Sequence, residues 1–175
     1  MNIVFIGPPL AGKGTQAKLL SIKLRIPVFS IGALLREYAK DDYKQYAMKG
    51  QNLPVVLKFN LLKEKLDNAK NGFILENFPA AEDDLMVFID YLNKHKLTID
   101  KAFNITISEE ETKKRMKQRD RIDDDTDIVK NRMAFQGKDR KIVLDYFSKM
   151  GVLVTINGEG SVEEIHKRVI DSLSL

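Results

Sequence analysis

Short apolar runs alternate along this chain with segments in which apolar residues recur at helical spacing. The first apolar run, residues 2–6, is rich in β-branched side chains and ends at Gly7. A run that is apolar on both sides is typical of a strand buried in a parallel sheet. The other runs that predict strands are residues 28–29, 73–75, 102–107 and 152–156.

The intervening segments have the pattern of amphipathic helices. In residues 15–24, apolar side chains lie at i, i+3 and i+7, and the pattern ends before Pro27. Ser108 and Ser161 each precede a glutamate by three residues, which predicts a capping box at the start of two helices. The other segments that predict helices are residues 31–38, 54–66, 85–92, 125–149 and 161–173.

Five strands that alternate with helices predict an α/β fold, a three-layer sandwich in which helices flank a five-stranded parallel sheet. We expect one domain over the 175 residues. Its predicted core is residues 1–30, 54–118 and 128–175, and its two departures are a small helical excursion at about 31–53 and a short lid at about 119–127.

Ligands of such folds bind at the carboxyl ends of the strands. Gly7, Glu76, Ser108 and Asn157 each follow a predicted strand. We therefore expect these four residues to gather along one edge of the sheet.

Composition narrows the class of protein. A hydrophobic content of 43% and a charged content of 31% are ordinary for a soluble globular chain. Cysteine is absent, which excludes disulfide frameworks and thiolate metal sites. No apolar run approaches the roughly 18 residues of a membrane span, and no basic leader precedes the first strand, so we expect a cytoplasmic protein that binds no membrane. Since no large apolar stripe is left over, we expect a monomer.

Residues 7–15 read Gly-Pro-Pro-Leu-Ala-Gly-Lys-Gly-Thr, between a predicted strand and a predicted helix. The N–H groups of such a turn and the helix N-terminus form an anion site. The spacing from Gly7 to Gly12 and Lys13 matches a P-loop, although Gly14 displaces the hydroxyl residue, Thr15, by one position. In a P-loop the lysine neutralises the terminal phosphates and the hydroxyl ligates Mg²⁺. The alternative is an ordinary glycine-rich turn. A net charge of +4 suits a nucleotide without deciding the question.

The segment Gly-Lys-Gly-Thr-Gln-Ala at residues 12–17 resembles the P-loop of the adenylate kinase family. Segments that resemble later parts of that family follow in the same order, at residues 30–36, 71–79, 121–132 and 157–162. The resemblance implies a short-lid nucleoside-monophosphate kinase that moves the γ-phosphoryl group of MgATP to a nucleoside monophosphate. ATP and Mg²⁺ are the implied cofactors, and AMP is the expected acceptor.

The resemblance also implies roles for individual residues. It implies ATP binding by Leu10, Ala11, Gly12, Lys13, Gly14, Thr15, Arg115 and Gly160. It implies acceptor binding by Ile31, Arg36, Gln51, Leu53, Asn77, Phe78, Asp84, Arg121 and Arg132. It implies catalytic roles for Lys13, Arg119, Arg121 and Arg132, and Mg²⁺ binding by Thr15 and, through water, Glu76. The alternative for the arginines is a solvated surface position of little consequence.

The chain departs from the family pattern mainly on the acceptor side. Ala80 stands where the family has an arginine that touches the acceptor phosphate, and Asp84 stands where a glutamine reads the AMP base. Ile31 and Ala33 replace a threonine and an aspartate, and Glu76 replaces a shorter carboxylate. A transition-state arginine is worth about 10³ to 10⁵ in rate, so its loss is a large change.

These departures leave several hypotheses open. The chain is an AMP kinase, a kinase for another monophosphate, or an ATP-binding homologue with weak or lost activity that acts as a sensor or regulator. A nucleic-acid module is poorly supported, because the lysines are spread along the chain without interleaved aromatic residues.

Overall fold

The computed structural model describes residues 1–39, 41, 45–46, 53–117 and 126–173, and for residues 126–136 it describes the backbone alone. The strands are β1 (Asn2–Ile6), β2 (Val28–Ser30), β3 (Phe73–Glu76), β4 (Lys101–Thr106) and β5 (Leu153–Asn157). The helices of the described part are α1 (Lys13–Leu24), α2 (Ile31–Tyr38), α4 (Val55–Asn68), α5 (Glu82–His95), α6 (Glu109–Lys117), α7 (Thr126–Lys149) and α8 (Val162–Asp171).

The five strands form one parallel sheet in the order β2-β3-β1-β4-β5. The first strand of the chain is therefore central, and Val4 pairs with Leu75 on one side and with Ala102 on the other. All five carboxyl ends lie along the same edge, since every pairing is parallel. The predicted α/β fold with a five-stranded parallel sheet is confirmed.

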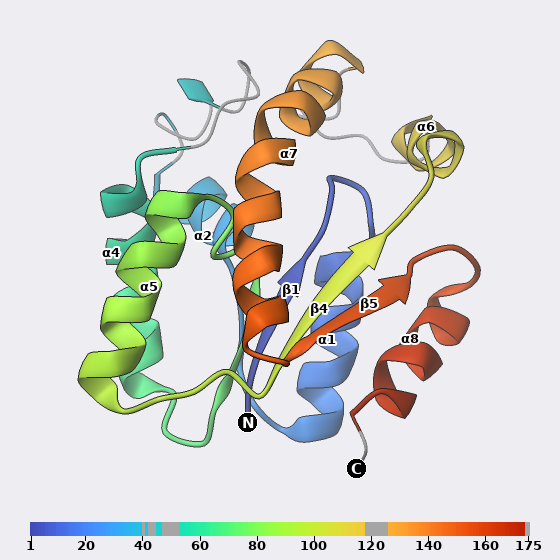
Figure 1. The fold of residues 1–175 in the computed structure, drawn as a ribbon. Helices are drawn as coiled ribbons and strands as arrows, with labels where there is room; N and C mark the ends of the chain where they lie inside the picture. Colours follow the sequence, from blue (N-terminus) through green and yellow to red (C-terminus); the bar gives the residue numbers. More distant parts are fainter. Residues whose placement is uncertain (40, 42–44, 47–52, 118–125, 174–175) are drawn as a thin grey trace.

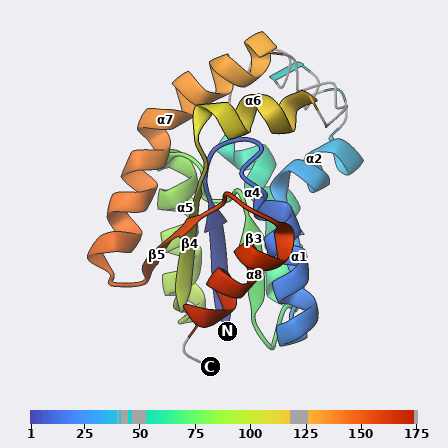
Figure 2. The same cartoon turned by 90° about the vertical axis from the view of Figure 1, so that its right-hand side faces the viewer.

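Helices cover both faces of the sheet, because alternate residues of each strand point to opposite sides. Ile3 and Phe5 of β1 pack in a cluster with residues of α1 and α8, whereas Val4 and Ile6 pack in a second cluster with residues of α2, α4, α5 and α7. Figures 1 and 2 show α5 and α7 on one side of the sheet and α8 on the other. The result is the predicted three-layer sandwich.

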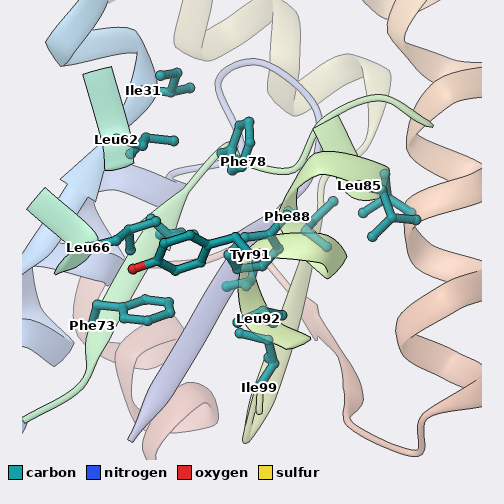
Figure 3. Close-up of a cluster of buried hydrophobic side chains, with 14 of the residues drawn as sticks. Ile31, Leu62, Leu66, Phe73, Phe78, Leu85, Phe88, Tyr91, Leu92 and Ile99 are labelled. Carbon is teal, nitrogen blue, oxygen red and sulfur yellow. The ribbon is translucent and has the colours of Figure 1, made fainter. Parts of the chain in front are cut away.

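The second cluster is the larger one, and α4 and α5 supply much of it (Figure 3). Its largest fully buried side chains include Phe73, Phe78 and Phe88. The rings of Phe78 and Phe88 meet edge to face with centroids 5.8 Å apart, an arrangement that aromatic pairs favour. This cluster supports one wall of the cleft described below.

The two predicted capping boxes have different outcomes. At α8, the Ser161 hydroxyl accepts from the Glu164 N–H and the Glu164 carboxylate accepts from the Ser161 N–H, so this box is confirmed. At α6, the Ser108 hydroxyl accepts from the Glu111 N–H, but the Ser108 N–H donates to Glu159. The reciprocal half of that prediction is wrong, because the Glu111 carboxylate pairs with an arginine instead.

The structure describes part of the predicted excursion, and it leaves most of the predicted lid outside the described residues. Part of the excursion is helix α2, whose Ile31, Leu34 and Leu35 are buried in the larger cluster. Residues 119–125 of the predicted lid lie outside the described residues, so the division into core, excursion and lid stays a prediction.

Among the described helices, none combines the length and the apolar character that crossing a bilayer requires.

Candidate functional site

The loop between β1 and α1 has a backbone that only particular residues allow. Gly7 has φ 147°, and a Cβ built there would lie 2.3 Å from the carbonyl oxygen of Ile105 in β4. Gly12 and Leu10 follow with φ of 87° and 65°, which curl the chain back before α1 begins at Lys13. The N-terminus of α1 therefore lies at the end of a tight glycine-rich turn, where its backbone N–H groups and the helix dipole favour an anion.

Lys13 places its charge at this loop. The residue is only 6% exposed, and its Nζ donates to the carbonyl oxygens of Gly7 at 3.0 Å and Pro8 at 2.7 Å. These bonds hold the ammonium beside the loop. A phosphate at the helix N-terminus would thus meet a cation that is already in position.

The side chains of Thr15 and Glu76, which both carry oxygen, lie at the phosphate loop. The Glu76 carboxylate at the end of β3 accepts from the Ser30 hydroxyl at 2.5 Å, and its Cδ is 3.9 Å from the point where a Cβ of Gly14 would lie. Thr15 and Glu76 line the same cleft. Mg²⁺ takes oxygen ligands and usually keeps waters and phosphates beside one or two protein groups, so these residues fit that ion. Within the described part of the chain, no group of three His, Cys, Asp or Glu side chains forms a protein-only metal site.

A cleft of about 1230 Å³ opens at this edge of the sheet. Its volume exceeds the range of about 300–1,000 Å³ typical of a site for one small ligand, so it has room for two. The predicted site residues that line it are Leu10, Gly12, Lys13, Gly14, Thr15, Ile31, Arg36, Leu53, Glu76, Asn77, Arg115 and Gly160. Ala11, Phe78 and Asp84, also predicted, are fully buried and do not line it.

Arg115 on α6 ties together three parts of the cleft wall. Its guanidinium donates to the carbonyl oxygens of Leu10 at 3.2 Å and Gly158 at 2.7 Å, and its Nε pairs with Glu111 at 2.7 Å. Its side chain is 19% exposed. The alternative of a solvated surface arginine is therefore wrong for Arg115.

The loop after β5 is held rigidly beside this arginine. The Glu159 carboxylate accepts from the Ser108 N–H at 3.1 Å, and hydrogen bonding from Ser108 holds the pKa of Glu159 below its ordinary value. Arg168 donates to the carbonyl oxygens of Asn157 at 2.8 Å and Glu159 at 2.5 Å. Gly160, with φ 108°, ends the turn at the cleft. Three side-chain hydrogen bonds thus fix this wall before any ligand arrives.

The opposite wall follows β3. Asn77 takes a left-handed conformation with φ 62°, which asparagine tolerates better than most residues, and its N–H donates to the Phe5 carbonyl oxygen at 3.0 Å. Ala80 lines the cleft, and its N–H donates to Asp84 Oδ2 at 3.1 Å. Asp84 is therefore a buried structural acceptor beneath position 80.

Lys58 on α4 is a cleft residue that the sequence reasoning missed. It is 5% exposed, it lines the cleft, and its ammonium pairs with Asp84. The available signal was its place four residues before Leu62 and eight before Leu66, on the buried stripe of the helix. A lysine on such a stripe needs a buried partner.

Gln51, Arg119 and Arg121 lie outside the described residues, and so does the side chain of Arg132. Their implied roles in acceptor binding and catalysis stay predictions.

A central parallel strand that runs into a glycine-rich turn, with a buried lysine at the start of the next helix, defines the P-loop class of α/β proteins. The family model for adenylate kinase matches residues 5–152. An adenylate kinase of Mycolicibacterium smegmatis is 33% identical over 181 residues, which cover 99% of each chain. One of Leptospira biflexa is 32% identical over 184 residues, covering 98% of this chain and 99% of the relative. This chain belongs to the adenylate kinase family, and it is a nucleoside-monophosphate kinase of the kind that uses ATP as a substrate.

Proposed function

We propose that this kinase transfers the γ-phosphoryl group of MgATP to AMP. The observation that carries the proposal is the single cleft of about 1230 Å³, which the phosphate loop and the wall after β3 both line. Phosphoryl transfer mainly requires that the donor and acceptor nucleotides be held in line with each other. A cleft that holds both nucleotides can position them in this way.

The predicted site residues have the following proposed parts in this reaction. Lys13 neutralises the terminal phosphates of ATP, and Arg115 and Gly160 form the wall against its base. Arg36 binds the acceptor phosphate. Thr15 and, through water, Glu76 would hold Mg²⁺, and the bound ion would neutralise charge on the phosphates. Arg119, Arg121 and Arg132 are proposed to clamp the transferring group. No protein nucleophile is needed, since the protein contributes position and charge.

The test is a coupled assay of ADP formation with AMP, GMP, CMP, UMP and the deoxynucleotides as acceptors. We expect AMP to be the preferred acceptor, with a turnover near the lower end, about 1 s⁻¹, of the range typical of kinases. A turnover below about 10⁻² s⁻¹ with every acceptor, together with tight MgATP binding, would instead favour the sensor or regulator hypothesis. The observation that favours the sensor or regulator hypothesis is that position 80, on the cleft wall, is an alanine without a guanidinium.

Arg115→Met is expected to raise the KM for MgATP about tenfold, because it removes charge-assisted hydrogen bonds worth about 1.5–3 kcal/mol each, part of which water replaces. Steady-state kinetics with MgATP and AMP varied in turn measure the effect. The matched control is Lys113→Met on the same helix, since Lys113 is 65% exposed and pairs only loosely with Glu109, at 4.0 Å. Equal effects of the two substitutions would contradict the proposed role of Arg115.

A further inference from the structure

Helices α4 and α5, which supply much of the larger apolar cluster, are joined by one buried ion pair next to the cleft. Lys58 of α4 pairs with Asp84 of α5, and their side chains are 7% and 0% exposed. Asp84 is fixed from its other side, because Oδ2 accepts the Ala80 N–H at 3.1 Å. Leu62, on the same stripe of α4, and Phe78, before position 80, are both fully buried in this cluster (Figure 3).

Only one member of the pair reaches the cleft. Lys58 lines it together with Leu53, Asn77 and Ala80, whereas Asp84 does not. A ligand in the cleft would therefore lie beside a lysine whose charge is balanced by a buried carboxylate.

Stability does not explain this pair. Taking two charges out of water costs several kcal/mol per ion, and replacing a buried pair by apolar side chains of similar size is often neutral or stabilising. In ligand sites, a few charged or polar groups placed in a mostly apolar wall fix the orientation of the ligand. The exposed pair of Lys63 and Asp67, one turn further along α4, shows that this helix also has ion pairs of the ordinary kind.

The surroundings favour a nucleobase over a phosphate as the partner of Lys58. A pair of zero net charge gives a phosphate dianion little net attraction, whereas it gives a neutral ring a hydrogen-bond donor. The cleft residues Ile31, Leu35 and Leu53 are apolar and at most 9% exposed, which suits the face of a ring.

We propose that Lys58 is a base-recognition residue for the acceptor nucleotide and that Asp84 is its positioning residue. The ammonium donates a hydrogen bond to a ring nitrogen or carbonyl oxygen of the base, and the carboxylate keeps the ammonium at the cleft wall. This inference rests on the proposed function, because it assigns the acceptor to this part of the cleft.

The test is equilibrium binding by calorimetry, which does not require turnover. The ligands are AMP, GMP, CMP, UMP, MgATP and ribose 5-phosphate, which has the acceptor's phosphate without a base. The variant is K58M/D84M, which removes both charges together and leaves neither one buried alone. The matched control is K63M/D67N, which removes the exposed pair from the same helix.

We expect the Kd of the preferred monophosphate to rise about 10- to 100-fold in K58M/D84M, the loss of one charge-assisted hydrogen bond. The spread of Kd among the four monophosphates should narrow, while the Kd values of MgATP and ribose 5-phosphate stay within about twofold. The control should change none of them. A merely structural pair would move the MgATP affinity and the thermal unfolding midpoint as well.

Three outcomes would overturn the inference: an unchanged Kd for every monophosphate in K58M/D84M, an equal loss for all four together with ribose 5-phosphate, or wild-type binding of no monophosphate more tightly than ribose 5-phosphate. The second outcome would assign Lys58 to the phosphate. Failure of the proposed function is separate: base-selective binding that depends on Lys58, without ADP formation, would support the inference and refute AMP phosphorylation.

Discussion

Lys13→Met is expected to lower kcat/KM by at least about 10³-fold and to weaken MgATP binding to a similar degree. The ammonium lies beside the phosphate loop, held by the carbonyl oxygens of Gly7 and Pro8, and methionine fills its space without its charge. Two to three charge-assisted hydrogen bonds to phosphate, at about 1.5–3 kcal/mol each, correspond to a loss of this size.

The measurement is MgATP affinity by calorimetry together with the coupled ADP assay. Lys23→Met is the matched control, because Lys23 lies in the last turn of the same helix and is exposed. Far-ultraviolet circular dichroism should show that both variants fold. A folded Lys13→Met protein that binds MgATP as tightly as the wild type does would refute the assignment of the phosphate loop.

The fold was predictable because its signals are local. Each strand is a short apolar run and each helix has a periodic apolar face, and their strict alternation leaves a parallel α/β sandwich as the simplest arrangement. The order of the strands was not predicted. The strand order depends on which apolar faces pack together. For example, the rings of Phe5 in β1 and Phe103 in β4 pack with their centroids 5.1 Å apart.

The site was predictable in proportion to how local its residues are. The loop from Gly7 to Thr15 is one continuous segment, so its spacing between a predicted strand and a predicted helix was enough to predict a phosphate site there. Arg115 had two interpretations in the sequence, and tertiary contacts with Leu10 and Gly158 decide between them. The pair of Lys58 and Asp84 joins two helices, and no local pattern couples them.

The two walls of the cleft differ in how they are built. On the phosphate-loop side, Lys13 is anchored by backbone carbonyl groups, so its charge is already in place when a nucleotide binds. On the other side, Ala80 adds no charge of its own and Lys58 is neutralised by Asp84. Arg36 is the described residue of that wall that we propose as a ligand of the acceptor phosphate. If this wall binds the acceptor as proposed, we expect acceptor affinity and transfer rate to be more sensitive to added charge than ATP affinity is.

This asymmetry predicts a gain of function. Ala80→Arg is expected to raise kcat with AMP by about 10- to 10³-fold, below the 10³- to 10⁵-fold effect of a complete transition-state arginine. Ala80 lines the cleft with Arg36, and it bonds to Asp84 through its backbone N–H, so an arginine at this position adds charge to the cleft wall without removing that donor.

Ala81→Arg is the matched control for this gain. It adds the same charge one residue further along, at the N-cap of α5, and Ala81 does not line the cleft. The coupled ADP assay, with MgATP saturating and AMP varied, separates kcat from KM for both variants. If Ala80→Arg changes kcat by less than about twofold, or if Ala81→Arg matches it, added charge at position 80 does not limit the reaction. In that case another cation already binds the acceptor phosphate. Arg121 and Arg132, proposed to clamp the transferring group, are then the next residues to test by substitution.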